Sequence, residues 1–155
     1  MLGMAASAAA PTIGTVDMQK LVQTTKLGQK IKTEIESDFK AKKTELEKKE
    51  QALRKDEKEL EKKKSVMSEE AYGKRLDELR TQMQQFREVL TKNQSELQKK
   101  QADLLDPLIT KIKQKTQIVA EKKSVTVVLE QSPMILYSLP SADLTDDVLK
   151  LVDEN

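Results

Sequence analysis

Apolar residues recur with helical spacing through the middle of the chain. Between about Lys30 and Lys64 there is neither glycine nor proline, and apolar residues stand at intervals of seven. This first series consists of Phe39, Leu46, Leu53, Leu60 and Met67. A second series at sevens consists of Leu76, Met83, Leu90, Leu97 and Leu104. Because one seam position of a heptad repeat recurs in this way, the pattern predicts two long helices.

A turn between the two series is predicted near residues 65–68. Ser68 is followed by two glutamates, which is typical of a helix start because the hydroxyl caps free backbone N–H groups and the carboxylates face the positive end of the helix dipole. Apolar residues also match at equal distances on either side of Ser68, as Leu60 and Leu76 do. We therefore predict an antiparallel helical hairpin, or coiled-coil arm, over residues 30–104.

The two ends of the chain carry short β-strand patterns. β-Branched and other apolar residues predict strands at 12–16, 124–130 and 134–138, and a short helix is predicted over 145–152. Asp17 directly follows the first of these strands. It is a suitable N-cap for the helix that begins there.

These end segments are assigned to one body, made of residues 11–29 and 105–155. Three short strands leave open edges and bury too little apolar surface to be stable alone, so we expect assembly between subunits to complete the sheet. Pro107 is expected to interrupt or kink the helix that enters this body. The predicted fold class is α+β, mainly α, with the long hairpin on a small β-body.

The composition favours an extended molecule over a compact globule. Charged residues make up 35% of the 155 residues and aromatic residues only 3%, so few large side chains are present to fill a spherical core. The net charge is only +2, but residues 40–100 hold 18 basic and 13 acidic side chains. The hairpin is therefore predicted to be positively charged, and the rest of the chain to be mildly acidic.

The sequence offers no candidate for catalysis. It has neither His nor Cys, which excludes histidine acid–base catalysis, cysteine nucleophiles and zinc sites built from these residues. Gly73-Lys74 is the only Gly-Lys pair, and it lacks the glycine pattern of a phosphate-binding loop. Lys62-Lys63-Lys64 is not accompanied by the aromatic residues on which nucleic-acid bases stack. We expect no enzyme activity, no metal, no cofactor and no nucleic-acid partner.

Residues 1–10 resemble the end of a secretory signal peptide. Ala6-Ser7-Ala8 fits a small-x-small cleavage pattern, although a positively charged segment before it is missing. We interpret these residues as a signal-peptide remnant, and an alanine-rich start without a targeting role is the alternative. No later run approaches the roughly 18 apolar residues that span a bilayer.

The predicted seam of the hairpin is uneven. The returning helix offers two apolar residues per heptad where the outgoing helix offers about one. Leu79 and Phe86 would therefore face Glu57 and Glu50 across the hairpin. Part of their surface is predicted to remain free for a bound chain; alternatively, lysine stems cover it as in ordinary coiled-coil packing.

Three segments carry a family resemblance: Ile13–Met18 (IGTVDM) before a long helix, Val125–Val128 (VTVV), and Asp143–Leu149 (DLTDDVL), which follows Tyr137. With the Lys-, Glu- and Gln-rich hairpin between them, they make the chain similar to the Skp family, also called OmpH-like, of bacterial periplasmic chaperones. The resemblance implies a periplasmic homotrimer whose helical arms enclose a cavity. In that cavity unfolded outer-membrane proteins would be held, without ATP, and kept from aggregating.

Two sets of candidate residues go with this resemblance. The client-binding set is Leu79, Met83, Phe86, Lys48, Lys49 and Arg87. The trimer-interface set is Ile13, Val16, Val127, Leu129, Ile135 and Tyr137, which lie on predicted strands that lack partners in one chain. A contact with lipopolysaccharide or the membrane periphery is left open, because no basic cluster here matches the proposed family site residue by residue. The alternative function is a structural coiled-coil spacer or adaptor that binds one folded partner.

Overall fold

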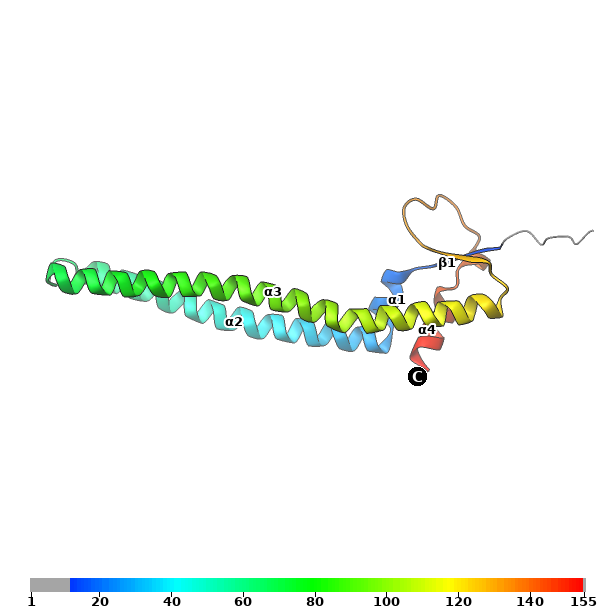
Figure 1. Ribbon diagram of the computed structural model, residues 1–155, viewed down its shortest axis with the longest axis horizontal. Coiled ribbons are helices and arrows are strands. Elements are labelled where there is room, and N and C mark those ends of the chain that lie inside the picture. The colour runs from blue at the N-terminus through cyan, green and yellow to red at the C-terminus, as the bar shows by residue number, and fades with distance from the viewer. Residues whose placement is uncertain (1–11, 155) are drawn as a thin grey trace, which may run out of the picture. The chain divides into compact units, whose positions relative to one another are not determined.

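The structure is a computed structural model that describes residues 12–154, so the signal-peptide remnant predicted for residues 1–10 lies outside the described part (Figure 1). The chain forms two compact units. The first, the body unit, comprises residues 12–32 and 104–154, and the second, the hairpin unit, comprises residues 33–103. Helices α2 (Lys26–Lys63) and α3 (Glu69–Lys122) contribute to both units. The predicted fold class, mainly helical with a long antiparallel hairpin and a small sheet, is confirmed.

In the hairpin unit, α2 and α3 run side by side in opposite directions (Figure 1). Ser68 caps the start of α3, because its hydroxyl accepts a hydrogen bond from the Ala71 N–H at 3.3 Å and its carbonyl accepts one from the Tyr72 N–H at 2.9 Å. Glu69 and Glu70 occupy the first turn, where the helix dipole favours negative charge. The helix start therefore has the local chemistry that its sequence indicates.

Two lysines fix how the helices of the hairpin pair. Lys42 Nζ lies 2.7 Å from Glu96 Oε2, and Lys100 Nζ lies 2.5 Å from Asp38 Oδ2. Lys42 Nζ also lies 3.2 Å from Asn93 Oδ1, and Lys100 Nζ lies 2.7 Å from Glu34 Oε1. The partners of each lysine therefore lie on both sides of the position that a pairing symmetric about Ser68 predicts. The observed register agrees with the predicted one.

The apolar stripe of the hairpin drifts away from the strict seven-residue series. Phe39 is 56% exposed and Leu90 is 41% exposed, whereas the neighbouring Asp38 and Val89 are half-buried. An α-helix has 3.6 residues per turn, so a position repeated every seven residues rotates by about 20° per heptad. Over several heptads this amounts to about one residue, which moves Phe39, at the start of its series, off the seam. The prediction that Leu90 lies on the seam is also wrong, but drift does not explain it, because Met83 and Leu97 on either side of it in the series stay half-buried.

The body unit contains a two-stranded parallel sheet. Strand β1 (Ile13–Val16) pairs with β2 (Val127–Glu130), with Ile13 opposite Val127. β2 begins three residues later than predicted because the preceding residues close α3. Ser124 has a φ of 55°, and the Val125 N–H donates to the Ala120 carbonyl at 2.9 Å, as in a Schellman helix end.

The strand predicted over 134–138 is absent. Residues after β2 form a turn in which the Ile135 N–H donates to the Ser132 carbonyl at 2.9 Å, and the segment then continues without strand pairing. Its side chains bury little surface against the sheet, since Leu136 is 96% exposed. A strand without a buried face or a pairing partner is not held in place within one chain.

Helices α1 (Met18–Thr24) and α4 (Thr145–Asp153) pack with α3 around the core of the body unit. Its fully buried apolar residues are Leu21, Leu108, Ile112, Leu144, Val148 and Val152. Each such side chain stabilises the fold by roughly 1.5–3 kcal/mol relative to an exposed one. On α4 and just before it the buried residues recur every fourth position, as expected for a helix with one apolar face.

α1 and α2 are separated at Thr25, whose backbone is extended, and a Cβ on Gly28 would lie 1.7 Å from the Val22 carbonyl oxygen. Only glycine fits that approach. Pro107 does not interrupt α3, which continues to Lys122. A short 3₁₀ helix, η1 (Pro140–Ala142), precedes α4.

Candidate functional site

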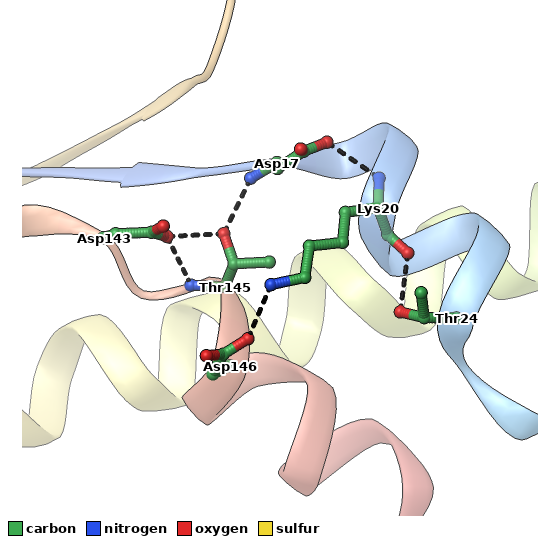
Figure 2. A network of polar contacts seen from close by, with 6 residues as sticks. All are labelled: Asp17, Lys20, Thr24, Asp143, Thr145 and Asp146. Atoms are coloured by element: carbon green, nitrogen blue, oxygen red, sulfur yellow. Dashed lines mark hydrogen bonds and ion pairs between the residues drawn. The ribbon is translucent and has the colours of Figure 1, made fainter. Parts of the chain in front are cut away.

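A network of polar contacts ties β1, α1 and α4 together in the body unit (Figure 2). The Thr145 hydroxyl accepts a hydrogen bond from the Asp17 N–H at 2.9 Å and donates to Asp143 Oδ1 at 2.5 Å. Asp17 in turn caps α1 through its side chain, which accepts from the Lys20 N–H at 2.7 Å. Lys20 Nζ lies 2.8 Å from Asp146 Oδ1. The network fixes the start of α1 against the start of α4.

Asp143, and not the Thr145 hydroxyl, accepts the first backbone N–H of α4. Asp143 Oδ1 accepts the Thr145 N–H at 2.9 Å, and the Thr145 hydroxyl is used between elements. Burial would raise the pKa of Asp143, but the hydrogen bonds from Thr145 outweigh it and hold the pKa below its ordinary value. The hydrogen bond and charge of Asp146 raise the pKa of Lys20. Across residues 12–154 no group of three or more carboxylates could hold a metal ion. Because the hydrogen bonds of the network join β1, α1 and α4, we assign it a structural role.

One face of the small sheet presents apolar side chains to solvent. Ile13 is 56% exposed, and Val127, directly opposite it on β2, is 45% exposed; Leu129 is 44% exposed. Tyr137 is exposed and Ile135 is half-buried. We call this set, with the exposed apolar residues that follow β2, the body surface: Ile13, Val127, Leu129, Met134, Ile135, Leu136, Tyr137 and Leu139.

Val16 does not belong to the body surface. It is only 4% exposed, because it lies on the opposite face of the sheet within its own chain. Its side chain is therefore largely covered within one chain, and its place in the predicted interface stays a prediction. Met134, Leu136 and Leu139 were not predicted as interface residues, although they lie in a run without charged residues that could have indicated an unusual surface.

A groove of about 600 Å³ lies within the body unit, beside the covered face of the sheet. Its apolar lining comes from α1, α3 and both strands: Val16, Met18, Val22, Ile109 and Val128. Lys113 and Glu130 add one positive and one negative charge to the lining. We call it the body groove. The sequence gives no direct signal for the body groove, because the groove depends on how two helices and two strands come together.

The predicted client-binding residues of the hairpin do not form one surface. Leu79 is only 7% exposed and lines a small pocket with Leu60 and Met67, so its side chain packs inside the hairpin. The expectation that Leu79 is left free for a partner is wrong, because the seam next to the tip closes over it. Met83 is half-buried on the same seam.

Phe86 and Lys49 come together on the hairpin. They line a shallow groove of about 290 Å³, with Leu53 and Val89 contributing apolar surface. Lys48 is exposed and outside this groove, and Arg87 lines a separate depression on α3. The structure therefore supports a joint site for two of the six predicted residues.

Three exposed apolar residues of the hairpin unit were missed. Phe39 is 56%, Leu90 is 41% and Val66 is 80% exposed. The heptad series placed Phe39 and Leu90 on the seam, and a helix period of 3.6 instead of 3.5 is the signal that would have moved Phe39 outward. These side chains are apolar contacts that an extended chain can reach.

Charges on the hairpin are mostly paired at its surface. Lys49 lies 2.8 Å from Glu45 and Arg54 lies 2.7 Å from Glu50, each within one helix. Exposed pairs of this kind contribute about 0.2–1 kcal/mol each. Lys55 and Lys74 each pair with a glutamate four residues away, whereas Lys62 and Lys63, in the last turn of α2, form no ion pair among residues 12–154. The basic surplus therefore gathers in part near the tip.

Both the sequence and the fold of this chain are similar to those of known proteins. Residues 12–152 match the family model described as outer membrane protein (OmpH-like). The fold is similar to the 2.83 Å crystal structure of a candidate outer membrane chaperone (OmpH-like) from Caulobacter crescentus CB15, with a TM-score of 0.84 and 18% identity over 95% of this chain and 86% of that chain. No curated protein matches the sequence. None of the helices within residues 12–154 combines the length and apolar character that crossing a membrane requires.

Proposed function

Because this chain belongs to the OmpH-like outer membrane protein family, we propose that it is an ATP-independent holding chaperone for unfolded outer-membrane proteins. The match of residues 12–152 to this non-enzymatic family is the observation that carries the proposal. The family also implies that the protein works in the periplasm. The structure supports the chaperone assignment with exposed apolar side chains on a highly charged helical hairpin.

Client binding on the hairpin would use weak and dispersed contacts. Phe39 and Leu90 are exposed, and the groove that holds Phe86 also holds a lysine, Lys49. Apolar side chains cover exposed strands of an unfolded client, while the surplus of positive charge attracts acidic clients. Release needs no nucleotide, because a client that folds or inserts into a membrane loses its extended form and is withdrawn from the binding equilibrium.

We further propose a homotrimer assembled through the body surface, with three hairpins around a client cavity. The body surface exposes neighbouring apolar residues such as Ile13 and Val127 on one face of a sheet that has only two strands. Contiguous apolar surface of this kind is typical of interaction sites. Light scattering of the purified protein should give three times the chain mass of 17.6 kDa. A stable monomer would exclude the trimer.

Aggregation of an unfolded outer-membrane protein after dilution from urea tests the chaperone function. Light scattering at increasing chaperone concentration should show full suppression near one trimer per client, without ATP. A Phe39→Ser, Leu90→Ser variant should suppress aggregation less well at the same concentration, because it lacks two exposed apolar contacts. If the unsubstituted protein leaves aggregation unchanged while it is folded and trimeric, it acts as a spacer or adaptor and the holding function is wrong.

A further inference from the structure

The last helix of the chain ends against the first residue of the long outgoing helix. Asp153, the last residue of α4, accepts a hydrogen bond from the Lys26 N–H through its Oδ1 at 2.9 Å. Lys26 is the first residue of α2. The first N–H groups of a helix have no partner within that helix, so each needs an acceptor from elsewhere. For Lys26 the acceptor lies 127 residues further along the chain.

A second acceptor for the same helix start is local. Thr25 is fully buried at the break between α1 and α2, and its hydroxyl accepts a hydrogen bond from the Gly28 N–H at 3.1 Å. Thr25 therefore caps the third residue of α2, as an ordinary N-cap does, while Asp153 caps the first. The first turn of α2 thus depends on one residue beside it and on one residue of α4.

The opposite end of α4 holds the start of α1. The Asp17 N–H donates to the Thr145 hydroxyl at 2.9 Å, and Lys20 Nζ lies 2.8 Å from Asp146 Oδ1 (Figure 2). Between the two ends of α4, Val148 is fully buried. Because the start of α4 meets the start of α1 and the end of α4 meets the start of α2, the two short helices run in the same direction. α4 therefore spans the whole of α1.

We propose that α4 anchors the start of α2, and that Asp153 is the positioning residue through which it does so. While α4 is docked, both ends of α1 and the first turn of α2 are held together; when the end of α4 detaches, Thr25 alone caps the start of α2. The charge of Asp153 suits this place, because the positive end of a helix dipole favours an anion. α2 continues into the hairpin unit, so the anchor determines how firmly the hairpin helix begins. The anchor goes beyond the proposed function, since it needs neither a client nor a second copy of the chain.

Amide hydrogen exchange, resolved residue by residue by NMR, tests the anchor. Asp153→Ala removes the acceptor, so the amides of residues 26–28 should exchange roughly fivefold faster or more, as expected for the loss of a helix cap. Asp153→Asn keeps an acceptor oxygen, and asparagine caps helices about as well as aspartate, so most of the protection should return. The matched control, Asp146→Ala, removes a carboxylate from the same helix but leaves the acceptor of the Lys26 N–H in place, and it should not change the exchange of residues 26–28.

The outcomes separate an anchor from a general contribution to stability. Faster exchange that is confined to the start of α2 and is reversed by Asp153→Asn supports the proposal. Unchanged exchange of residues 26–28 in Asp153→Ala overturns it. An equal rise throughout the body unit, including the buried Leu108 and Ile112 of α3, also overturns it, because Asp153 then stabilises the body as a whole. The same holds if Asp153→Asn restores nothing or if Asp146→Ala has the same effect. None of these outcomes affects the proposed function.

Discussion

The two units of the molecule are stabilised in different ways. Ten of the eleven buried apolar residues found among residues 12–154 belong to the body unit, and only Leu79 belongs to the hairpin unit. The hairpin has instead a half-buried stripe, long helices and exposed ion pairs. In the close-packed core of the body unit, substitution of one side chain lowers the stability of the fold. The half-buried stripe of the hairpin unit is less closely packed, so apolar side chains can remain at its surface. The comparison predicts that matched substitutions act differently in the two units.

Two glycine substitutions should change stability in opposite directions. Gly28→Ala places a methyl group 1.7 Å from the Val22 carbonyl oxygen, so the break between α1 and α2 must shift. We expect a loss of about 3 kcal/mol or more, the upper end of overpacking costs. Gly73→Ala meets no atom within 4 Å inside α3 and should stabilise the protein by about 0.5–1 kcal/mol. Urea unfolding followed by circular dichroism measures both. Equal effects would contradict the contrast between the units.

Two apolar residues of the hairpin should separate stability from client binding. Leu79→Ser removes a buried side chain and should lower the free energy of unfolding by about 2–4 kcal/mol. Phe39→Ser changes an exposed side chain and should alter stability by less than about 0.5 kcal/mol. Its effect should appear as several-fold weaker binding of an unfolded client, measured by fluorescence titration. If Phe39→Ser lowers stability as much as Leu79→Ser does, Phe39 is a packing residue and not a client contact.

Acid should loosen the network of the body unit first. The pKa of Asp143 is lowered in the folded state, so its carboxylate adds stability above the pKa of the unfolded chain and loses this contribution as pH falls through the folded pKa. Asp143→Asn should cost up to about 1 kcal/mol at pH 7, a modest value because the carboxylate is largely exposed to solvent. The difference between the two proteins should shrink as pH falls below the ordinary aspartate pKa of about 3.9, and it should vanish once pH lies below the lowered pKa of the folded state.

The matched control for this measurement lies on the hairpin. A hydrogen bond from Lys42 lowers the pKa of Glu96, which is an exposed member of an ion pair. Glu96→Gln should therefore shift stability in the same sense with a smaller change. Thermal unfolding between pH 2.5 and pH 7 compares the two variants. A larger change for Glu96→Gln would show that the hairpin, and not the body network, carries the acid sensitivity.

Local chemistry made several parts of the fold predictable from the sequence. Asp17 and Ser68 each cap a helix through hydrogen bonds to residues within four positions, so the information lies next to the cap itself. The hairpin followed from apolar spacing in the same way. By contrast, the drift of Phe39 off the seam depends on a 3.6-residue period that accumulates over several turns.

The candidate sites were harder to predict because they depend on contacts between distant residues. Val16 has the composition of an interface residue, but the helices of its own chain cover it. The segment 134–138 has the β-branched and aromatic composition of a strand, yet no partner strand is available within one chain. The body groove arises only where α1, α3 and β2 meet. Burial and pairing of this kind are properties of the packed chain and not of any short stretch of sequence.

The smallest expected effect is that of salt on the rate at which an unfolded client associates with the hairpin. It separates the charge-driven association step from the apolar contacts that hold the bound client. Residues 40–100 carry a surplus of five positive charges, and Lys62 and Lys63 near the tip form no ion pair among the residues that the structure describes. Such charges act over a Debye length, about 8 Å at physiological ionic strength and about 3 Å at 1 M. Stopped-flow association with an acidic unfolded client should slow several-fold between low and high salt, with a smaller change in dissociation, because apolar contacts are not screened. A basic client should show no slowing. If both clients respond alike, the positive charges serve solubility, and client capture rests on the exposed apolar residues alone.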